Sequence, residues 1–336
     1  MHKVSVVIPT LNRAEVLATT IDGIEHQTVP RDLYELLVVD NNSSDHTQAV
    51  LTQKAAVYPN LKIGFQPRPG AAAARNTGIR FSSGEIVLFI DDDIFAEPGL
   101  IEAHITGHRE NPGASIVGTV VPQWDSTTDP FLRYLRDAQI FSPYNFACDR
   151  PMNFSDYHTG NVSTIRKQLH EVGGFDERFF LYGMEDIELG YRLQKQGFHM
   201  VPGVLASGRH EYFPTSGQFL KKCQQAGYSL GILIDLHPEL GRQFVDSRKF
   251  TGMLKRFYSL YPILMSALTP FSERLVAWER RRGKRALTPA LDNHYALAIR
   301  YHFFLGFQAH LRSKQSGLGS MAAAPHGMES YKRVVN

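Results

Sequence analysis

Three consecutive carboxylates, Asp91-Asp92-Asp93, directly follow an apolar run over residues 86–90. Adjacent carboxylates repel one another unless a cation or hydrogen-bond donors compensate their charge. Mg2+ and Mn2+ prefer oxygen ligands and commonly join one or two carboxylates to substrate phosphates. If strand alternation continues through the triplet, Asp91 and Asp93 point to one side and Asp92 to the other. The triplet therefore predicts a divalent-cation site facing a nucleotide diphosphate, with a solvated acidic turn as the alternative.

Two further groups could belong to the same site. Glu185-Asp186 stands after Gly183 near the start of a predicted helix, and His210 follows a predicted short strand over 199–207. Acidic residues are also common in the first turn of a helix, where they complement its dipole. With 14 histidines in the chain, His210 could equally be a surface histidine. Both interpretations stay open on these residues alone.

The first half of the chain alternates strand and helix patterns, which positions these groups. Predicted strands cover residues 4–9, 36–40, 60–65 and 86–90, and predicted helices cover 44–58 and 71–81. A further helical stretch carries Leu17, Ile21 and Ile24 at spacings of four and three. This alternation predicts an α/β fold with a mostly parallel sheet flanked by helices. Ligands of such sheets bind beyond the carboxyl ends of the strands, where Thr10, Asp40 and Asp91 stand.

The remaining chain has a more mixed pattern. Strands are predicted over 115–121 and 199–207, and a helix over 181–196 that stops at Gly197. After about residue 215 the pattern becomes helical and rich in aromatic and basic residues, which predicts a helical C-terminal extension. We expect one domain over 1–215, a helical region over 216–312 and a flexible tail over 313–336.

Composition excludes several classes of protein. Hydrophobic residues make up 43% of 336 and charged residues 21%, which is ordinary for a globular chain and argues against disorder or a polytopic membrane protein. The net charge of +3 is too small to indicate a nucleic-acid partner. Cys148 and Cys223 allow one disulfide but neither a disulfide framework nor a CxxC metal pair. The first ten residues predict a strand and not a signal peptide, so an intracellular, reducing setting is expected.

Six segments, taken in order, resemble the motifs of inverting family 2 glycosyltransferases with a GT-A, Rossmann-like fold. They are VSVVIPTLNR (4–13), VVDNNSSD (38–45), PGAAAARNTG (69–78), IDDD (90–93), GNVS with GGFDE (160–163 and 173–177) and GMEDIEL (183–189). The resemblance covers about residues 3–215 and makes 1–215 the nucleotide-sugar-binding and catalytic domain. It implies a hexosyltransferase-type enzyme with a nucleotide-sugar donor, UDP being the expected nucleotide, and a glycan or glycolipid acceptor.

The resemblance also implies roles for individual residues. Asp40, with Asn42 beside it, should accept a hydrogen bond from the imide of uracil or thymine. Arg75 should reach the diphosphate or order the Asp91 loop, with a helix-surface arginine as the alternative. The other donor-binding positions are expected at Pro9, Thr10, Asn12, Arg13, Asp91 and Asp92, and the ligands of Mn2+ or Mg2+ at Asp93 and His210.

The same resemblance assigns the proton chemistry. The acceptor hydroxyl must lose a proton as it attacks the anomeric carbon, and a carboxylate within hydrogen-bond reach can accept it. The family pattern places this general base at Asp186, with Glu185 as a neighbour that orients it or changes its pKa.

The C-terminal half leaves its partner open. Residues 250–264 carry apolar residues at helical spacing beside basic ones, 279–285 form a basic cluster, and 294–311 add further aromatic residues. Such a surface suits peripheral association with an anionic membrane, at the inner face of the plasma membrane for a cytoplasmic protein. A helical cap packed on the sheet domain, or a homo-oligomer formed through these helices, is the alternative. The apolar run 258–268 is too short to span a bilayer.

Two other functions compete with glycosyl transfer. A sugar-1-phosphate nucleotidyltransferase also has a nucleotide-binding parallel sheet, but it usually opens with a glycine-rich segment, and residues 9–13 (PTLNR) contain no glycine. A catalytically inactive glycan-binding or scaffolding relative is the other alternative, although every expected carboxylate is present.

Overall fold

The computed structural model describes residues 4–123, 129–138, 140, 150–241, 244 and 288–315. These residues form two compact units. Unit 1 contains 4–123, 140 and 150–212, and unit 2 contains 129–138, 213–241, 244 and 288–315. The predictions for Cys148, for 250–264 and 258–268, for the basic cluster 279–285 and for the tail beyond 315 lie outside the described residues.

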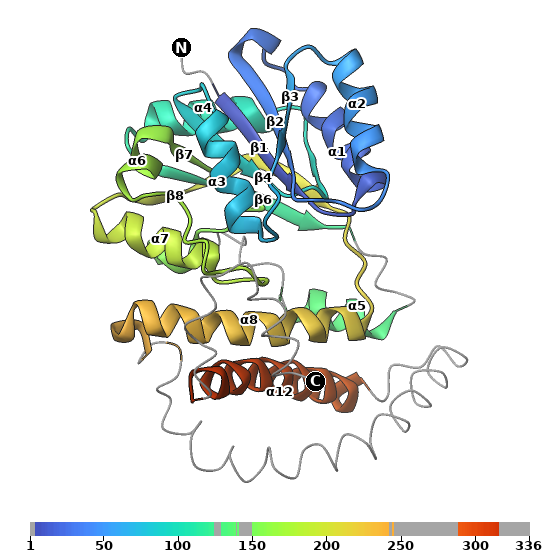
Figure 1. Cartoon of the computed structure of the whole chain (residues 1–336), viewed down its shortest axis with the longest axis vertical. Helices are drawn as coiled ribbons and strands as arrows, with labels where there is room; N and C mark the ends of the chain where they lie inside the picture. Colours follow the sequence, from blue (N-terminus) through green and yellow to red (C-terminus); the bar gives the residue numbers. More distant parts are fainter. Residues whose placement is uncertain are drawn as a thin grey trace. The chain divides into compact units, whose positions relative to one another are not determined.

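An eight-stranded sheet forms the centre of the described part of unit 1, in the order β3-β2-β1-β4-β7-β6-β8-β5 (Figure 1). The strands are β1 (Val4–Thr10), β2 (Tyr34–Asp40), β3 (Leu61–Phe65), β4 (Ile86–Ile90), β5 (Ile94–Ala96), β6 (Ser115–Pro122), β7 (Asn161–Ile165) and β8 (Met200–His210). The helices are α1 (Ala14–Glu25), α2 (Thr47–Val57), α3 (Ala71–Phe81), α4 (Leu100–Glu110), α6 (Arg166–Glu171) and α7 (Glu185–Lys195). Short 3-10 turns lie at Arg31–Leu33 and Phe154–Asp156.

The sheet confirms the α/β prediction and adds a mixed half. Strands β3, β2, β1 and β4 are parallel, as strand–helix alternation requires, and β6 and β8 are also parallel. Strand β7 runs antiparallel to both β4 and β6, and β5 runs antiparallel to β8. These two strands come from the region over 94–174 where the sequence pattern is mixed, so their direction could not be predicted.

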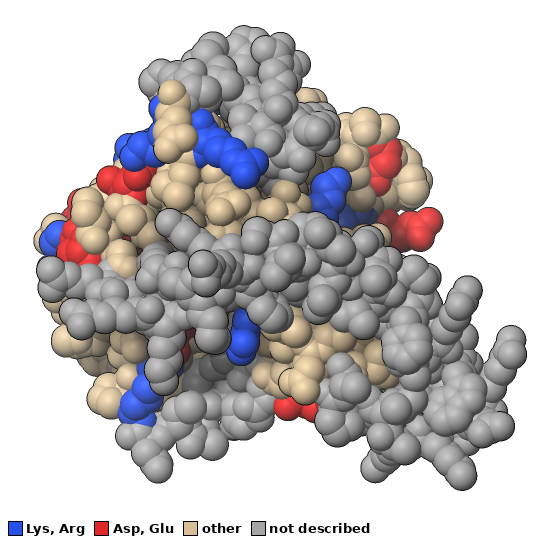
Figure 2. Space-filling view, turned by 90° about the horizontal axis from the view of Figure 1, so that it is seen from below, with Lys and Arg blue, Asp and Glu red and all other residues tan. Residues whose placement is uncertain are grey.

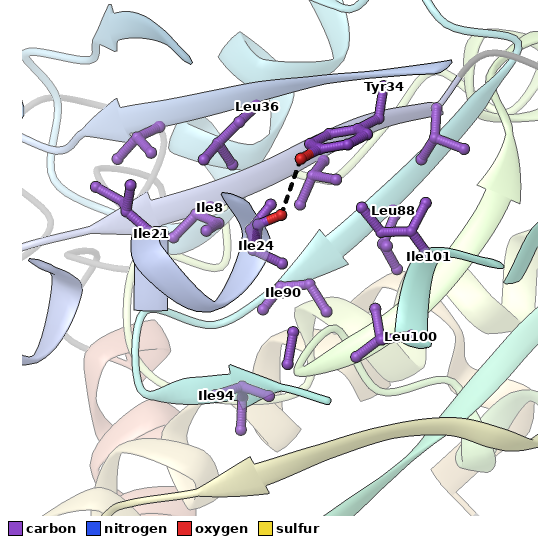
Figure 3. Packing of buried hydrophobic residues seen from close by; sticks show 14 of the residues in the cluster. Ile8, Ile21, Ile24, Tyr34, Leu36, Leu88, Ile90, Ile94, Leu100 and Ile101 are labelled. Atoms are coloured by element: carbon purple, nitrogen blue, oxygen red, sulfur yellow. Dashed lines mark hydrogen bonds between the residues drawn. The ribbon is translucent and has the colours of Figure 1, made fainter. Parts of the chain in front are cut away.

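One buried hydrophobic cluster of unit 1 lies between the sheet and helices α1 and α4 (Figure 3). On β1, Val4, Val6 and Ile8 face this core, while Val7 meets α3 on the opposite side at Gly78. A Cβ at Gly78 would collide with the Val7 side chain, so α3 can approach the sheet this closely only with glycine there. The Tyr34 hydroxyl, buried in the core, donates to the Ile24 carbonyl at 3.1 Å.

Some helices and strands have the limits predicted from the sequence, and others begin or end at different residues. Helix α3 and strand β4 have the predicted limits, whereas the helix predicted over 44–58 begins only at Thr47. The strand predicted over 199–207 continues to His210, with an irregular register between Gly118 and Thr119 of its neighbour β6. The extension matters because it carries His210 to the end of the sheet.

Unit 2 is helical in its described part, which confirms the predicted C-terminal helical extension. It contains α5 (Pro130–Asp137), α8 (Ser216–Leu236), a 3-10 turn (Pro238–Leu240) and α12 (Thr288–Gln315). Helices α8 and α12 cross closely because Gly227 and Gly306 each lie against the backbone of the facing helix, where a Cβ would collide. The Phe131 ring packs edge-on against Phe219 and Tyr295.

The described helices and one face of the molecule bear on the predicted membrane contact. No helix among the described residues is long and apolar enough to cross a membrane. On the face shown in Figure 2, the described Lys and Arg residues form small groups interspersed with Asp and Glu.

Candidate functional site

The predicted site residues gather at the carboxyl ends of the parallel strands. Thr10 at the end of β1 is in register with Asp40 at the end of β2, and Asp91 follows β4, the other neighbour of β1. The topology that places these three ends together also places their loops together. This is the edge at which open parallel sheets bind ligands.

The loops after β1 and β2 are joined by hydrogen bonds. Asn12, with a left-handed φ of 54°, accepts hydrogen bonds through Oδ1 from the backbone N–H of Ser44 at 2.7 Å and of Asp45 at 3.3 Å. The Asn12 N–H in turn donates to Ser43 Oγ at 2.9 Å. Asparagine tolerates this backbone conformation better than most residues, so its position here has a local structural reason. These contacts show Asn12 joining two loops that both belong to the predicted donor site.

Asp40 is buried at the end of β2, with 1% of its surface exposed. Its Oδ1 accepts from the Ser43 N–H at 3.0 Å, and its Oδ2 accepts from the Gln48 side-chain amide. Asn42 beside it is exposed and has a φ of 65°. For Asp40 to meet a base, the Gln48 side chain must therefore shift or share the carboxylate with the ligand.

A first arginine cluster forms around Arg13. Its Nη2 lies 2.6 Å from Asp93 Oδ2 and its Nε lies 3.6 Å from Asp92 Oδ1. Thr10 Oγ1 donates to Asp92 Oδ2 at 2.8 Å. Burial, only partly offset by Arg13, raises the pKa of Asp92 to about 7.

The alternation expected within the carboxylate triplet is wrong. The chain turns directly after Ile90 instead of continuing as a strand, so Asp92 and Asp93 share Arg13 while Asp91 reaches a different arginine. The two groups that strand geometry would have separated are the ones that lie together.

His210 reaches the first arginine cluster through the sheet. In the pairing of β5 with β8, His210 lies opposite Ile94, the residue after Asp93. Its Nε2 is 3.4 Å from Asp93 Oδ1, and its ring stacks on Tyr212 with 5.5 Å between centroids. The Arg13 guanidinium also lies over the Tyr212 ring, at 5.9 Å.

A second arginine cluster forms around Arg75, which projects from α3. Its Nη2 donates to Asp91 Oδ1 at 2.8 Å and its Nη1 donates to Glu185 Oε1 at 3.0 Å. The side chain is only 5% exposed and lies over the Phe175 ring at 5.7 Å. Arg75 therefore joins the Asp91 loop to the start of α7.

Helix α7 begins at Glu185, four residues after the predicted start at 181. Gly183 and Met184 both have left-handed backbone angles, with φ of 87° and 74°, so the chain cannot be helical before Glu185. This break puts Glu185 and Asp186 in the first turn. Asp186 Oδ1 accepts from the Ile187 N–H at 2.8 Å, and its Oδ2 lies 3.5 Å from His158 Nδ1.

The pKa values of the two neighbouring carboxyl groups, Glu185 and Asp186, are shifted in opposite directions. Burial and repulsion from Asp186 raise the pKa of Glu185 to about 7, although Arg75 opposes the shift. Burial also disfavours ionised Asp186, but the hydrogen bond and charge of His158, the Ile187 N–H and Arg75 together hold its pKa below the usual range. Paired carboxylates whose environments separate their pKa values are typical of sites that move protons.

Three site residues were not singled out from the sequence. His158 had no signal beyond its place two residues before the GNVS segment. Asn76 follows Arg75 and binds the backbone of Phe175 on both sides, donating to its carbonyl at 2.9 Å and accepting from its N–H at 2.8 Å. Asn41 donates to the carbonyls of 66 and 68 and accepts from the N–H of Gly70, which fixes the loop before α3.

The residues that could hold a metal can be compared with the needs of Mn2+ or Mg2+. Among the described residues no group of three or more His, Cys, Asp or Glu side chains is arranged to hold a metal ion. Asp93 and His210 nevertheless converge at 3.4 Å, and these metals commonly complete their coordination with water and substrate phosphates. A two-ligand site completed by a diphosphate therefore fits, provided that Arg13 releases Asp93.

Comparison with known proteins gives a family match and a fold match. The model described as glycosyl transferase family 2 matches residues 5–173, and one described as the N-terminal domain of galactosyltransferase matches 143–209. Glycosyltransferase AglE of Haloferax volcanii is 45% identical over 236 residues, covering 67% of this chain and 71% of that protein. The validoxylamine A glucosyltransferase of Streptomyces hygroscopicus subsp. jinggangensis is 32% identical over 221 residues, covering 58% of this chain. The chain spans about half the length of that enzyme.

Two solved structures share the fold. A mannosyltransferase from Pyrobaculum calidifontis, in complex with GDP-Man and Mn2+, aligns with a TM-score of 0.55 and 21% identity over 94% of this chain and 87% of its own. S. aureus TarS 1–349 aligns with a TM-score of 0.53 and 17% identity, over 94% of this chain and 92% of its own. At these identities the likeness concerns the fold alone.

Proposed function

Because the chain belongs to glycosyl transferase family 2 and has the fold of GT-A glycosyltransferases, we propose that it is an inverting enzyme that transfers a sugar from a nucleotide diphosphate to an acceptor hydroxyl. UDP is the proposed nucleotide, and a glycan or glycolipid is the proposed acceptor. One observation carries the proposal: four carboxyl groups from two distant segments contact Arg13 and Arg75 at the carboxyl ends of the parallel strands, and Asp186 stands next to the fourth, Glu185.

The donor nucleotide is proposed to lie over the loops after β1 and β2. Their mutual hydrogen bonds hold Pro9, Thr10, Asn12 and Arg13 beside Asp40 and Asn42. Asp40 would accept from the imide of the base, since a carboxylate is an acceptor on both oxygens. Gln48, which now donates to Asp40, is the residue that would make room.

Asp93 and His210 would hold Mn2+ or Mg2+. When bound, such a cation neutralises the negative charge that develops on the leaving diphosphate. The Mn2+ in the Pyrobaculum calidifontis relative supports a divalent ion for this proposal. Arg13, once released from Asp93, retains a charge that suits a phosphate oxygen.

Asp186 is the proposed general base. As the acceptor oxygen bonds to the anomeric carbon, the bond from that carbon to the diphosphate breaks on the opposite face, and the acceptor proton passes to Asp186. Its lowered pKa keeps it ionised at neutral pH, as a base must be. Glu185, with its raised pKa, is less suited to that role and is held by Arg75.

Calorimetric titration of UDP, dTDP and GDP, first with Mn2+ or Mg2+ and then with chelator, tests the donor site. We expect metal-dependent binding of UDP or dTDP that Asp40→Ala weakens by about tenfold, the loss of one hydrogen bond to a charged group. Asp32→Ala, at an exposed carboxylate, is the matched control. Tight binding of GDP alone would contradict the assignment of UDP, and absence of binding to all three would contradict the donor site.

A further inference from the structure

His158 lies beside Asp186 although the two residues come from different elements. His158 precedes β7, and Asp186 is in the first turn of α7. The His158 Nδ1 is 3.5 Å from Asp186 Oδ2, and the two side chains are 22% and 19% exposed. Both groups are thus mostly enclosed while a part of each stays accessible.

A buried hydrogen-bond network fixes the backbone that carries His158. The Asn161 N–H donates to the His158 carbonyl at 3.4 Å. The Asn161 side chain, which is fully buried, donates to the carbonyls of Thr119 and Ala206 at 3.1 and 2.9 Å. Its Oδ1 lies 2.8 Å from Nε2 of His104, whose pKa burial lowers to about 4, so that the ring is neutral and donates. The turn at His158 is therefore anchored to β6, β8 and α4 at once.

The surroundings of Asp186 single out His158 among its charged and titratable neighbours. Glu185 precedes it on the same helix, Arg75 faces it from α3, and Tyr157 and Tyr182 lie within electrostatic range. Arg75 already binds Asp91 and Glu185 through its two terminal nitrogens. His158 Nδ1 lies 3.5 Å from Asp186 Oδ2, within ion-pair distance.

We propose that His158 is a positioning residue for the transfer reaction: its Nδ1–H holds Oδ2 of Asp186 and fixes the direction of the carboxylate. The inference rests on the proposed function, in which Asp186 accepts the acceptor proton. His158 does not itself receive that proton; it keeps the same N–H directed at the carboxylate before and after the transfer. The arrangement follows the general rule that a base is oriented by a third group.

The first experiment needs no substrate. In protein labelled with 13C at aspartate carboxyl groups, the Asp186 signal is identified by its disappearance in Asp186→Asn and then titrated with pH. His158→Ala should move the Asp186 midpoint upward by about one pH unit, because a hydrogen bond and an opposite charge both favour the ionised form. His158→Asn should recover part of the shift, and His170→Ala, at an exposed histidine on α6, should produce none. An unchanged midpoint in His158→Ala overturns the inference.

The second experiment is kinetic and uses the sugar nucleotide that supports turnover. For His158→Ala we expect kcat at neutral pH to fall by about 10- to 100-fold, KM for the donor to stay within a factor of about two, and the acidic limb of the rate profile to move upward with the Asp186 midpoint. Partial rescue by His158→Asn separates positioning from folding, and that variant replaces His158→Ala if the latter unfolds.

The outcomes distinguish this inference from the proposed function. If Asp186→Asn retains full activity, the base assignment fails, while the carboxyl titration still decides whether His158 controls Asp186. If Asp186→Asn is inactive but His158→Ala has a wild-type rate and pH profile, the role of His158 alone is overturned.

Discussion

The two arginine clusters use the same components in different surroundings. Each arginine binds two carboxylates at the same edge of the sheet. The Arg13 side chain is 29% exposed, whereas the Arg75 side chain is 5% exposed. Water therefore reaches the Arg13 guanidinium, whereas the Arg75 guanidinium is enclosed in protein. The carboxylates differ in another way, since Asp92 and Asp93 are 12% and 9% exposed and Asp91 is 40% exposed.

This difference assigns the clusters different tasks. Because the Arg13 guanidinium is partly exposed, we expect it to release Asp93 to the proposed cation at a lower cost than Arg75 would release its partners. Arg75 cannot leave without burying the charge of Glu185 beside Asp186, so it acts as a fixed part of the site. The first cluster should therefore control donor binding, and the second should control stability and the geometry of the proposed base.

Asp186→Asn, next to the Arg75 cluster, should have the largest effect. An amide cannot accept the acceptor proton, so the rate of transfer should fall by about 100- to 10,000-fold. The affinity for UDP by calorimetry should stay within a factor of about two, because the Arg13 cluster is untouched. Asp32→Asn serves as a control at an exposed carboxylate. If the variant lost UDP affinity to the same extent as rate, the assignment of donor binding to the Arg13 cluster and of the base to the Arg75 cluster would be contradicted.

Arg75→Met should be the most destabilising change. At about pH 8, above the pKa of Glu185, it leaves that carboxylate buried without its cation, and breaking a buried pair from one side costs about 3–5 kcal/mol. The free energy of unfolding in urea measures this cost. Arg178→Met removes an ion pair whose arginine is 52% exposed and should change stability by less than about 1 kcal/mol. Equal effects of the two variants would show that burial is not what distinguishes Arg75.

The raised pKa of Glu185, a member of the Arg75 cluster, predicts that the free energy of unfolding depends on pH. Between its ordinary value of 4.5 and about 7, the folded protein holds a proton on Glu185 that the unfolded chain releases. Folding is therefore favoured at the acidic end, and stability decreases as pH rises through this range. Because a pKa difference of one corresponds to about 1.4 kcal/mol, the free energy of unfolding should decrease by an amount on the order of 2–3 kcal/mol.

Glu185→Gln should remove the part of the decrease that Glu185 causes, since glutamine does not titrate, and should leave the part caused by Asp92, whose pKa is also raised to about 7. Urea unfolding at pH 5, 6, 7 and 8 compares the two proteins, with the exposed Glu15→Gln as the control. If the free energy of unfolding of Glu185→Gln decreased with pH as steeply as that of the wild-type protein, another group would be responsible for the decrease.

Asp93→Ala tests the Arg13 cluster. If Asp93 ligates the metal, the variant should lose the metal-dependent part of UDP binding, a decrease of about tenfold or more, or 1.4 kcal/mol. The affinity in chelator should hardly change, and Asp32→Ala should behave as wild type. Equal UDP affinity of the wild-type protein in Mn2+ and in chelator would contradict the metal site.

Elements whose residues are close in sequence could be predicted, and contacts between distant segments could not. The limits of α3 and β4 follow from local pattern, and the strand ends already placed Thr10, Asp40 and Asp91 at one edge. Arg75 and Glu185 are 110 residues apart, so no local pattern indicates their contact. The approach of His210 to Asp93 depends on β5 pairing with β8, and β5 has only three residues.

Local rules failed where the backbone leaves regular structure. Alternation was extended through Asp91-Asp92-Asp93, but the strand ends at Ile90 and the chain turns. The helix predicted from 181 begins only at Glu185, because Gly183 and Met184 both have a positive φ, which is rare for methionine. These irregular points lie at the site itself, where function requires side chains that regular elements could not bring together.

Arg13→Met should have the smallest effect on stability and the clearest effect on binding. Water reaches the Arg13 guanidinium, which is 29% exposed, so its loss should cost less in urea unfolding than Arg75→Met, although Asp92 and Asp93 are only 12% and 9% exposed. Without Arg13, Asp92 and Asp93 lack their resident cation, so Mn2+ titrated in the absence of nucleotide should bind several-fold more tightly. If Arg13 also meets the diphosphate, UDP in chelator should bind more weakly in the variant. A loss of stability as large as that of Arg75→Met, with Mn2+ affinity unchanged, would show that both arginines are fixed structural charges and that the two clusters do not differ in function.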